Sequence, residues 1–126
     1  MRFFFDNNLS FHLAGGMKEF GEDVVHLRDH FPENATDAEW LPFVGDNDLV
    51  LITRDDAIRW NPAEIQAVRR HKVAAFFLGG KKLSRCQLIQ QLVRNWPRMK
   101  DLAASEKRPF AFRVPPHGTA FTRLSL

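Results

Sequence analysis

The sequence predicts an α/β sandwich, in which a mainly parallel β-sheet is covered by helices on both faces. Three observations lead to this prediction. Short apolar runs recur along the chain, the segments between them show helical periodicity, and the two kinds of segment alternate. The 126 residues are enough for one compact domain. We therefore expect a single domain over residues 1–126, in which residues 115–126 form a tail or a terminal strand.

In the first part of the chain, the run Phe3–Phe5 predicts a short buried strand. A helix should follow and end near Gly21, because apolar residues then recur at intervals of three or four positions. Its apolar stripe consists of Leu9, Leu13, Met17 and Phe20. Residues 24–25 give a second strand. Thr36, followed three residues later by Glu39, is a capping-box pattern and predicts the start of a second helix.

In the second part of the chain, the apolar stretch Leu49–Thr53 predicts a third strand. Pro62 suits the first turn of the next helix, and residues 73–80 give a fourth strand. The long helical segment that follows should be interrupted or restarted at Pro97, because proline lacks the backbone donor. Residues 109–114 alternate with a period of two and predict the last strand.

Acidic residues directly follow two of the expected strands. Asp6 comes after the first strand, and Asp55 and Asp56 come after the third. Ligands bind at the carboxyl ends of the strands in open α/β sheets, so these acids should gather there, with Asp37 near them at the start of the intervening helix. Gathered carboxylates repel one another unless a cation is present. Oxygen ligands suit Mg²⁺ or Mn²⁺, which could activate water for displacement at phosphorus.

Three other acids have ordinary structural explanations. Glu39 is the expected capping-box acid, and Asp46 and Asp48 belong to a turn before the third strand. The candidate catalytic residues are therefore Asp6, Asp37, Asp55 and Asp56. A thiolate zinc site is excluded, because Cys86 is the only cysteine.

The charge of the chain is divided unevenly between its two parts. Residues 1–56 contain four Lys or Arg and twelve Asp or Glu, whereas residues 57–126 contain fourteen Lys or Arg and three Asp or Glu. Clustered basic groups attract phosphate backbones. The division therefore favours a cation-binding region beside a surface suited to a polyanion, and two solvated faces are the alternative.

Taken together, these features resemble the PIN-like nuclease domains. The matching stretches are FFFDNNLS at the start, Gly21 with DVVHL, then DAEWL and LVLITRDD, which together span residues 1 to about 80. The chain is most similar to the toxin-associated branch related to VapC toxins, and it is also similar to Mut7-C type PIN-like domains. The resemblance implies a three-layer α/β/α sandwich with an acidic Mg²⁺ or Mn²⁺ site that cleaves phosphodiester bonds in RNA.

The resemblance also assigns roles by position. Asp6 matches the acid after the first strand, Asp37 the acid that opens the middle helix, and Asp55 the acid of a Thr-x-Asp turn; these three would hold the metal. Such turns often place a further acid two residues later, where this chain has Ala57. Asp56 stands one residue early, so either it substitutes from a shifted backbone or the metal has fewer direct ligands.

Basic residues after the third and fourth strands would then contact the RNA backbone or neutralise developing charge. These candidate RNA-binding residues are Arg54, Arg59, Lys81, Lys82 and Arg85.

Two other functions remain open at this point. A phosphorelay receiver would use Asp55 or Asp56 as its phosphorylated residue, with Lys81 or Lys82 on the phosphoryl group. A non-catalytic PIN-like scaffold would bind RNA or a protein after losing part of its metal site.

If the toxin analogy holds, an antitoxin should cover the acidic edge, with an Arg reaching the carboxylates. The apolar tail residues Phe121, Leu124 and Leu126 could serve that partner or a homodimer, or pack back as a terminal strand. The chain has neither a signal-peptide pattern nor a membrane-length apolar stretch, and we expect a cytoplasmic protein.

Overall fold

The computed structural model describes residues 1–54 and 60–126. Within these ranges, six strands form one sheet in the order β2-β1-β3-β4-β5-β6. The strands are β1 (Phe3–Phe5), β2 (Val24–His26), β3 (Val50–Arg54), β4 (Ala74–Leu78), β5 (Phe110–Val114) and β6 (Thr122–Arg123). All neighbours pair in parallel except β6, which runs antiparallel to β5.

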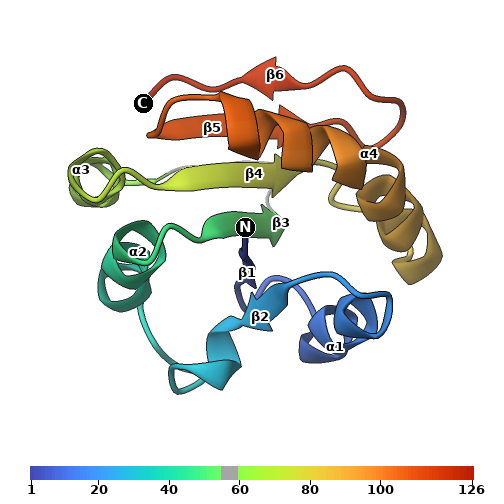
Figure 1. The fold of residues 1–126 in the computed structure, drawn as a ribbon, viewed down its shortest axis with the longest axis horizontal. Helices are drawn as coiled ribbons and strands as arrows, with labels where there is room; N and C mark the ends of the chain where they lie inside the picture. The colour runs from blue at the N-terminus through green and yellow to red at the C-terminus, as the bar shows by residue number, and fades with distance from the viewer. Residues whose placement is uncertain (55–59) are drawn as a thin grey trace.

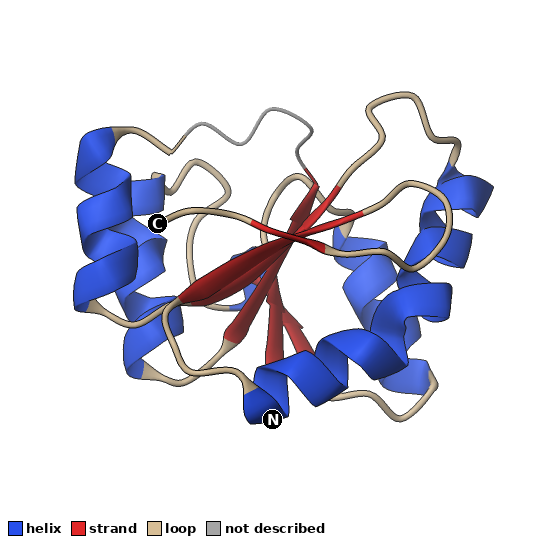
Figure 2. Ribbon diagram, turned by 90° about the horizontal axis from the view of Figure 1, so that it is seen from above, coloured by secondary structure: helices blue, strands red, loops and turns tan. Residues whose placement is uncertain are grey.

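Helices cover both faces of this sheet. They are α1 (Phe11–Glu19), the 3₁₀ helix η1 (Leu27–Asp29), α2 (Asp37–Asp46), α3 (Pro62–Arg70) and α4 (Arg85–Ser105). Figure 1 shows α1 and α4 on one side of the sheet and α2 and α3 on the other. Figure 2 shows the same arrangement from above, with the strands crossing between two layers of helices. The predicted three-layer α/β/α sandwich is confirmed.

The Phe3–Phe5 run is fully buried because β1 lies inside the sheet and both of its faces are covered. Successive side chains of a strand point to opposite faces. Phe3 packs on Trp96 of α4, with ring centroids 4.4 Å apart, whereas Phe4 stacks on Trp40 of α2 at 5.6 Å. Three consecutive phenylalanines therefore supply both hydrophobic cores.

One connection in the sandwich differs in hand from the others. The chain moves in the same direction across the sheet from β3 to β4 and from β4 to β5, yet α3 and α4 pack on opposite faces. The β4-α4-β5 crossover is therefore opposite in hand to β3-α3-β4. The crossovers through α1, α2 and α3 share one hand, the common right-handed one, so α4 makes the rare left-handed connection (Figure 1).

Three details of the sequence prediction are wrong. Phe20 is not on the buried stripe, because α1 ends at Glu19 and the Phe20 side chain is 86% exposed. Thr36 does occupy the N-cap of α2, but its side chain makes no capping hydrogen bond, so the capping box with Glu39 does not form. Pro97 does not interrupt the last helix, since α4 runs through it.

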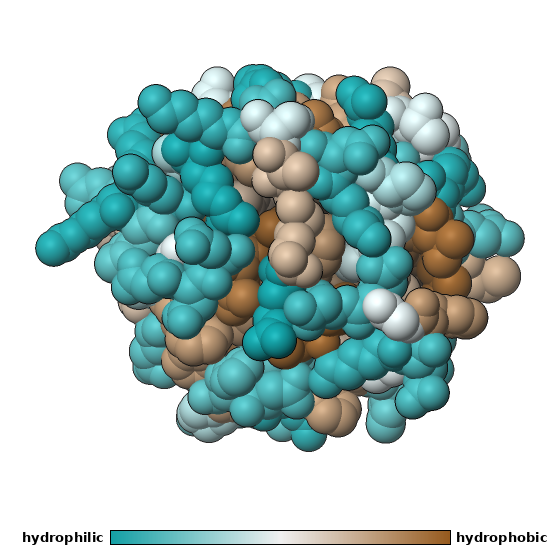
Figure 3. Space-filling model, in the orientation of Figure 1, coloured by the Kyte–Doolittle hydropathy of each residue, from teal (hydrophilic) through white to brown (hydrophobic). Residues whose placement is uncertain are grey.

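The C-terminal residues pack back onto the sandwich. β6 pairs with β5, Phe121 packs against the core under α4, and Leu124 and Leu126 pack against the opposite core. Figure 3 shows exposed hydrophobic residues near the centre of the drawn face and at its right-hand side, where α4 lies in Figure 1. On α4, Ile89 is 47% and Val93 58% exposed. Among the helices of the described residues, none is long and apolar enough to cross a membrane.

Candidate active site

The topology places a ligand-binding position at the carboxyl ends of β1 and β3. These strands are neighbours, but the chain leaves β1 through α1 and leaves β3 in the opposite direction through α3, on the other face. Ligands bind at such switch points in open α/β sheets. Phe5 is in register with Ile52, so the next residues along the two strands, Asp6 and Thr53, meet at this point.

The Asp6 carboxylate is buried, and among the described residues Thr53 and Asn8 donate hydrogen bonds to it. Thr53 Oγ1 donates to Asp6 Oδ2 at 2.6 Å, and the Asn8 backbone N–H donates to Oδ1 at 3.0 Å. The Asn8 side-chain amide lies 3.4 Å from Oδ2 and 3.2 Å from Thr53 Oγ1, which closes the network. Asp6 is only 6% exposed, so these donors compensate for the burial of its charge and fix its orientation.

Asp37 lies near enough to feel the charge of Asp6. It is the first residue of α2 and is half-buried. Its pKa is raised from 3.8 to about 7, first by burial, then by a hydrogen bond with Glu64 and the negative charges of Glu64 and Asp6. Two of the four predicted catalytic acids therefore lie within electrostatic range of each other, and burial together with the neighbouring acids favours the protonated form of Asp37.

Glu64, which the sequence interpretation missed, is a further acid beside Asp37, to which it is hydrogen-bonded. It lies in the first turn of α3, where its backbone N–H donates to Asn61 Oδ1 at 2.8 Å and its carboxylate accepts from the Asn61 N–H at 3.3 Å. This capping box is a sufficient structural role for Glu64, so the sequence gives no reason to expect its interaction with Asp37. Asp37 and Glu64 line a pocket of about 370 Å³ between the starts of α2 and α3.

Three of the predicted site residues lie outside the described residues. They are Asp55, Asp56 and Arg59, which belong to residues 55–59. Their assignment as metal ligand, catalytic acid and RNA contact remains a prediction.

Arg54 acts in the structure as a clamp on the loop after β4. Its guanidinium Nη2 donates to the Leu83 carbonyl at 3.0 Å and to the Lys81 carbonyl at 3.3 Å, and lies 3.5 Å from that of Gly80. Gly80 has a φ of +100°, and an added Cβ would lie 2.8 Å from the Pro116 side chain. The loop therefore depends on both a cation and a glycine for its shape.

The remaining predicted RNA contacts are carried by this loop and by the helix after it. Lys81, Lys82 and Arg85 are all exposed. Because the loop follows β4, it lies at the carboxyl edge of the parallel sheet, as Asp6 does. Ser84 begins α4 with a capping box, in which its Oγ accepts from the Gln87 N–H at 3.1 Å. The exposed Lys81, Lys82 and Arg85 therefore lie on a segment that is held by hydrogen bonds from Arg54 and by the Ser84 cap.

The acids that the sequence interpretation set aside have other surroundings. Glu39 is exposed on α2, and Asp46 accepts from His71 Nδ1 at 2.8 Å. Asp48 has a positive φ of 54° in the turn before β3. Asp46 and Asp48 precede β3 and lie at the amino end of the sheet, away from Asp6.

The donor set at the switch point fits a hard divalent cation. Asp6 and Asp37 offer carboxylate oxygens, and Mg²⁺ typically takes only one or two carboxylates while keeping several waters. Within residues 1–54 and 60–126, no three Asp, Glu, His or Cys side chains are grouped closely enough to hold a metal ion. Among the described residues, Asp6 and Asp37 are therefore candidate ligands that do not form a metal site by themselves.

Comparison with known families agrees with this geometry. The family model of the PIN-like domain matches residues 1–80. The chain belongs to the PIN-like domain family. The matched range contains Asp6, Asp37 and Glu64, whereas Lys81, Lys82 and the whole of α4 lie beyond it. The match favours a PIN-like protein over a phosphorelay receiver. No curated protein and no solved structure matches the chain.

Proposed function

We propose that this PIN-like domain is a Mg²⁺- or Mn²⁺-dependent endoribonuclease. The observation that carries the proposal is the buried Asp6 carboxylate, oriented by Thr53 and Asn8 at the switch point and close enough to Asp37 to raise its pKa. Membership in the PIN-like family supports the same activity, because PIN domains are generally nucleases.

Asp6 and Asp37 would hold the metal, together with Asp55. When bound, the ion supplies a water of lowered pKa and neutralises charge on the scissile phosphate. Thr53 and Asn8 keep the Asp6 oxygens in place, so little reorganisation is needed on binding. Asp37 must give up its proton to become a ligand, so metal affinity should fall as the pH drops below about 7.

The loop after β4 would hold the substrate beside these acids. Lys81 and Lys82 provide exposed positive charges at the same edge of the sheet. Arg54 is already engaged with the carbonyls of this loop, so its contribution would be to position the lysines rather than to contact phosphate alone.

The direct test is cleavage of an end-labelled single-stranded RNA by the purified protein with Mn²⁺ or Mg²⁺. We expect metal-dependent cleavage that Asp6→Asn reduces by about a hundredfold or more, because an oriented ligand is lost. Asp101→Asn is the matched control, since Asp101 is an exposed acid on α4. Metal-independent cleavage, or equal rates for wild type and Asp6→Asn, would contradict the proposal. RNA binding without cleavage would indicate the non-catalytic scaffold.

We further propose that the nuclease is the toxin of a toxin–antitoxin pair. An antitoxin would cover the acidic edge and place an Arg on its carboxylates. The apolar tail residues Phe121, Leu124 and Leu126 are packed on the cores, whereas Ile89 and Val93 of α4 are exposed and would be the apolar contacts for it. Induced expression in a bacterial host should arrest growth, and Asp6→Asn should relieve the arrest. Arrest that persists in Asp6→Asn would contradict this proposal.

A further inference from the structure

Phe11 and Arg28 form an exposed aromatic and cationic pair at the carboxyl edge of the sheet. Phe11 is the first residue of α1, which follows β1, and Arg28 lies in η1, directly after β2. The Phe11 side chain is 40% exposed, and Arg28 Cζ lies 5.2 Å from the centroid of its ring. Both residues therefore lie at the end of the sheet that carries Asp6.

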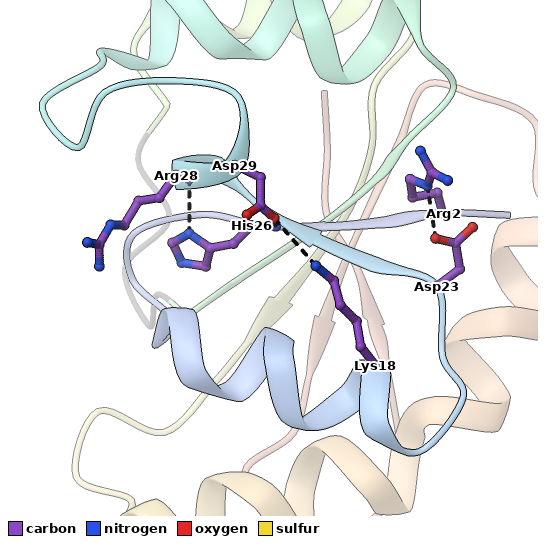
Figure 4. Close-up of polar contacts among 6 residues, drawn as sticks. All are labelled: Arg2, Lys18, Asp23, His26, Arg28 and Asp29. Carbon is purple, nitrogen blue, oxygen red and sulfur yellow. Dashed lines mark hydrogen bonds and ion pairs between the residues drawn. The ribbon is translucent and has the colours of Figure 1, made fainter.

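His26 contacts both residues of this pair. It is buried, and its ring meets the edge of Phe11 at a centroid distance of 5.4 Å. Its Nδ1 accepts from the Arg28 N–H at 3.1 Å, and its Nε2 donates to the Leu9 carbonyl at 2.8 Å. Figure 4 shows the first of these bonds, with the Arg28 guanidinium extending away from the His26 ring.

Asp29, the acid next to Arg28, makes two contacts with other residues. Asp29 accepts from the His26 N–H at 2.8 Å and also pairs with Lys18 of α1 at 3.7 Å (Figure 4). The neighbouring acid is thus directed toward α1 rather than toward the Arg28 side chain. Arg28 is exposed, and its guanidinium lies over the face of the Phe11 ring.

The same contacts connect the pair to the acidic site. The Leu9 N–H donates to the Asp6 carbonyl at 3.1 Å, and the Leu9 carbonyl is the acceptor of His26. A short series of hydrogen bonds therefore runs from Asp6 through Leu9 and His26 to Arg28. The position of the pair relative to Asp6 is set by the fold and not by a long flexible segment.

We propose that Phe11 and Arg28 form a stacking site for an unpaired nucleobase of the RNA strand whose backbone passes the Asp6 site. This inference rests on the proposed ribonuclease function and adds that the substrate is single-stranded there. Bases stack on exposed aromatic side chains and on Arg guanidinium planes, and both groups are present. The bases of a duplex are stacked inside the helix and cannot reach such a site.

The test measures binding of a fluorescent single-stranded RNA to the full chain in EDTA, so that no cleavage occurs. Phe11→Ala should weaken binding about fivefold or more, and Phe11→Trp should keep or strengthen it. Phe20→Ala is the matched control, because Phe20 is an exposed aromatic residue just past the other end of α1, and it should have no effect. A strand with the same backbone but abasic sites should bind wild type and Phe11→Ala equally.

The result that would overturn the stacking site is wild-type affinity in Phe11→Ala, an equal loss for the abasic strand, or an absence of binding by the wild type. Cleavage with Mn²⁺ is measured separately on the same proteins. A loss of binding in Phe11→Ala without any wild-type cleavage supports the stacking site and contradicts the nuclease. Cleavage by the wild type with unaltered binding in Phe11→Ala supports the nuclease and contradicts the stacking site.

Discussion

Thr53 Oγ1 donates a 2.6 Å hydrogen bond to Asp6 Oδ2, across the boundary between β1 and β3 at the switch point of the sheet. Both residues are buried. The bond therefore joins the two strands where their connections diverge, and it sets the direction in which the carboxylate faces. In the proposed nuclease, Thr53 is a positioning residue that acts through Asp6.

Thr53→Val keeps the shape of the side chain but removes the donor. We expect the free energy of unfolding to fall by about 1–2 kcal/mol, because a buried carboxylate loses a charge-assisted hydrogen bond. The rate of RNA cleavage should fall about tenfold or more, with little change in KM, and Thr53→Ser should restore it. Urea unfolding and steady-state cleavage measure the two effects. A loss of stability in Thr53→Val without any change in kcat would show that the bond is only structural.

Asp37 should make the protein less stable as the pH rises. The unfolded chain releases this proton near the ordinary pKa of 3.8, whereas the folded chain holds it to about 7. Between these values the unfolded state binds fewer protons, so the Asp37 contribution to the free energy of unfolding falls as pH rises. Asp37→Asn should therefore be more stable than wild type by about 1–2 kcal/mol above pH 7, after allowance for solvent screening.

This prediction is tested by urea unfolding of wild type and Asp37→Asn without added metal, from below pH 3.8 to above about pH 7. The difference should vanish below the ordinary pKa of 3.8. A constant difference at all pH values would mean that Asp37 does not titrate in the folded state as described.

Glu64→Gln should lower the pKa of Asp37, since it removes one of the neighbouring negative charges that raise it. The decline in stability with rising pH should then end below about 7 in this variant, and Mn²⁺ should bind at lower pH than in wild type. Glu39→Gln is the control, because Glu39 is an exposed acid on the same helix as Asp37. NMR titration of the Asp37 carboxyl carbon reads the shift directly. Equal titration in the two variants would contradict the interaction of Glu64 with Asp37.

Arg54→Met should loosen the loop after β4 by removing its hydrogen bonds to the Lys81 and Leu83 carbonyls. Hydrogen exchange should accelerate at the Leu83 amide, which donates to Gly80, and RNA affinity should fall about two- to tenfold as the lysines lose their fixed position. Arg94→Met on α4 removes the same charge from an exposed site and should leave this exchange unchanged. Unchanged exchange in Arg54→Met would show that the clamp does not hold the loop.

Periodicity and position in the sequence were sufficient to predict most of the fold. Phe3–Phe5 is apolar without alternation, which is typical of a strand buried on both faces, and the acid after it was correctly expected at the edge of the sheet. The errors concern helix ends, where residue type and spacing do not fix the hydrogen bonds or the last turn. Thr36 has the residue type of a cap without its hydrogen bond, and Phe20 fits the helical spacing but stands after the last turn.

The parts of the site that could not be predicted depend on contacts between distant segments. Glu64 is 27 positions after Asp37 and has a sufficient local role with Asn61, so only the packing of α3 beside α2 reveals their interaction. Arg54 was expected on RNA because of its charge, and its bonds to the loop after β4 follow from tertiary structure. The unusual hand of the α4 crossover likewise leaves no signal in a single sequence.

The central claim is that Asp6, with Asp37, holds a divalent metal at the switch point. Titration of Mn²⁺ into the purified wild type and Asp6→Asn above pH 7, followed by calorimetry in buffers of different ionisation enthalpy, tests it most directly. We expect saturable binding by the wild type, with proton release as Asp37 ionises, and no binding by Asp6→Asn. Equal Mn²⁺ affinity in the two proteins would contradict it.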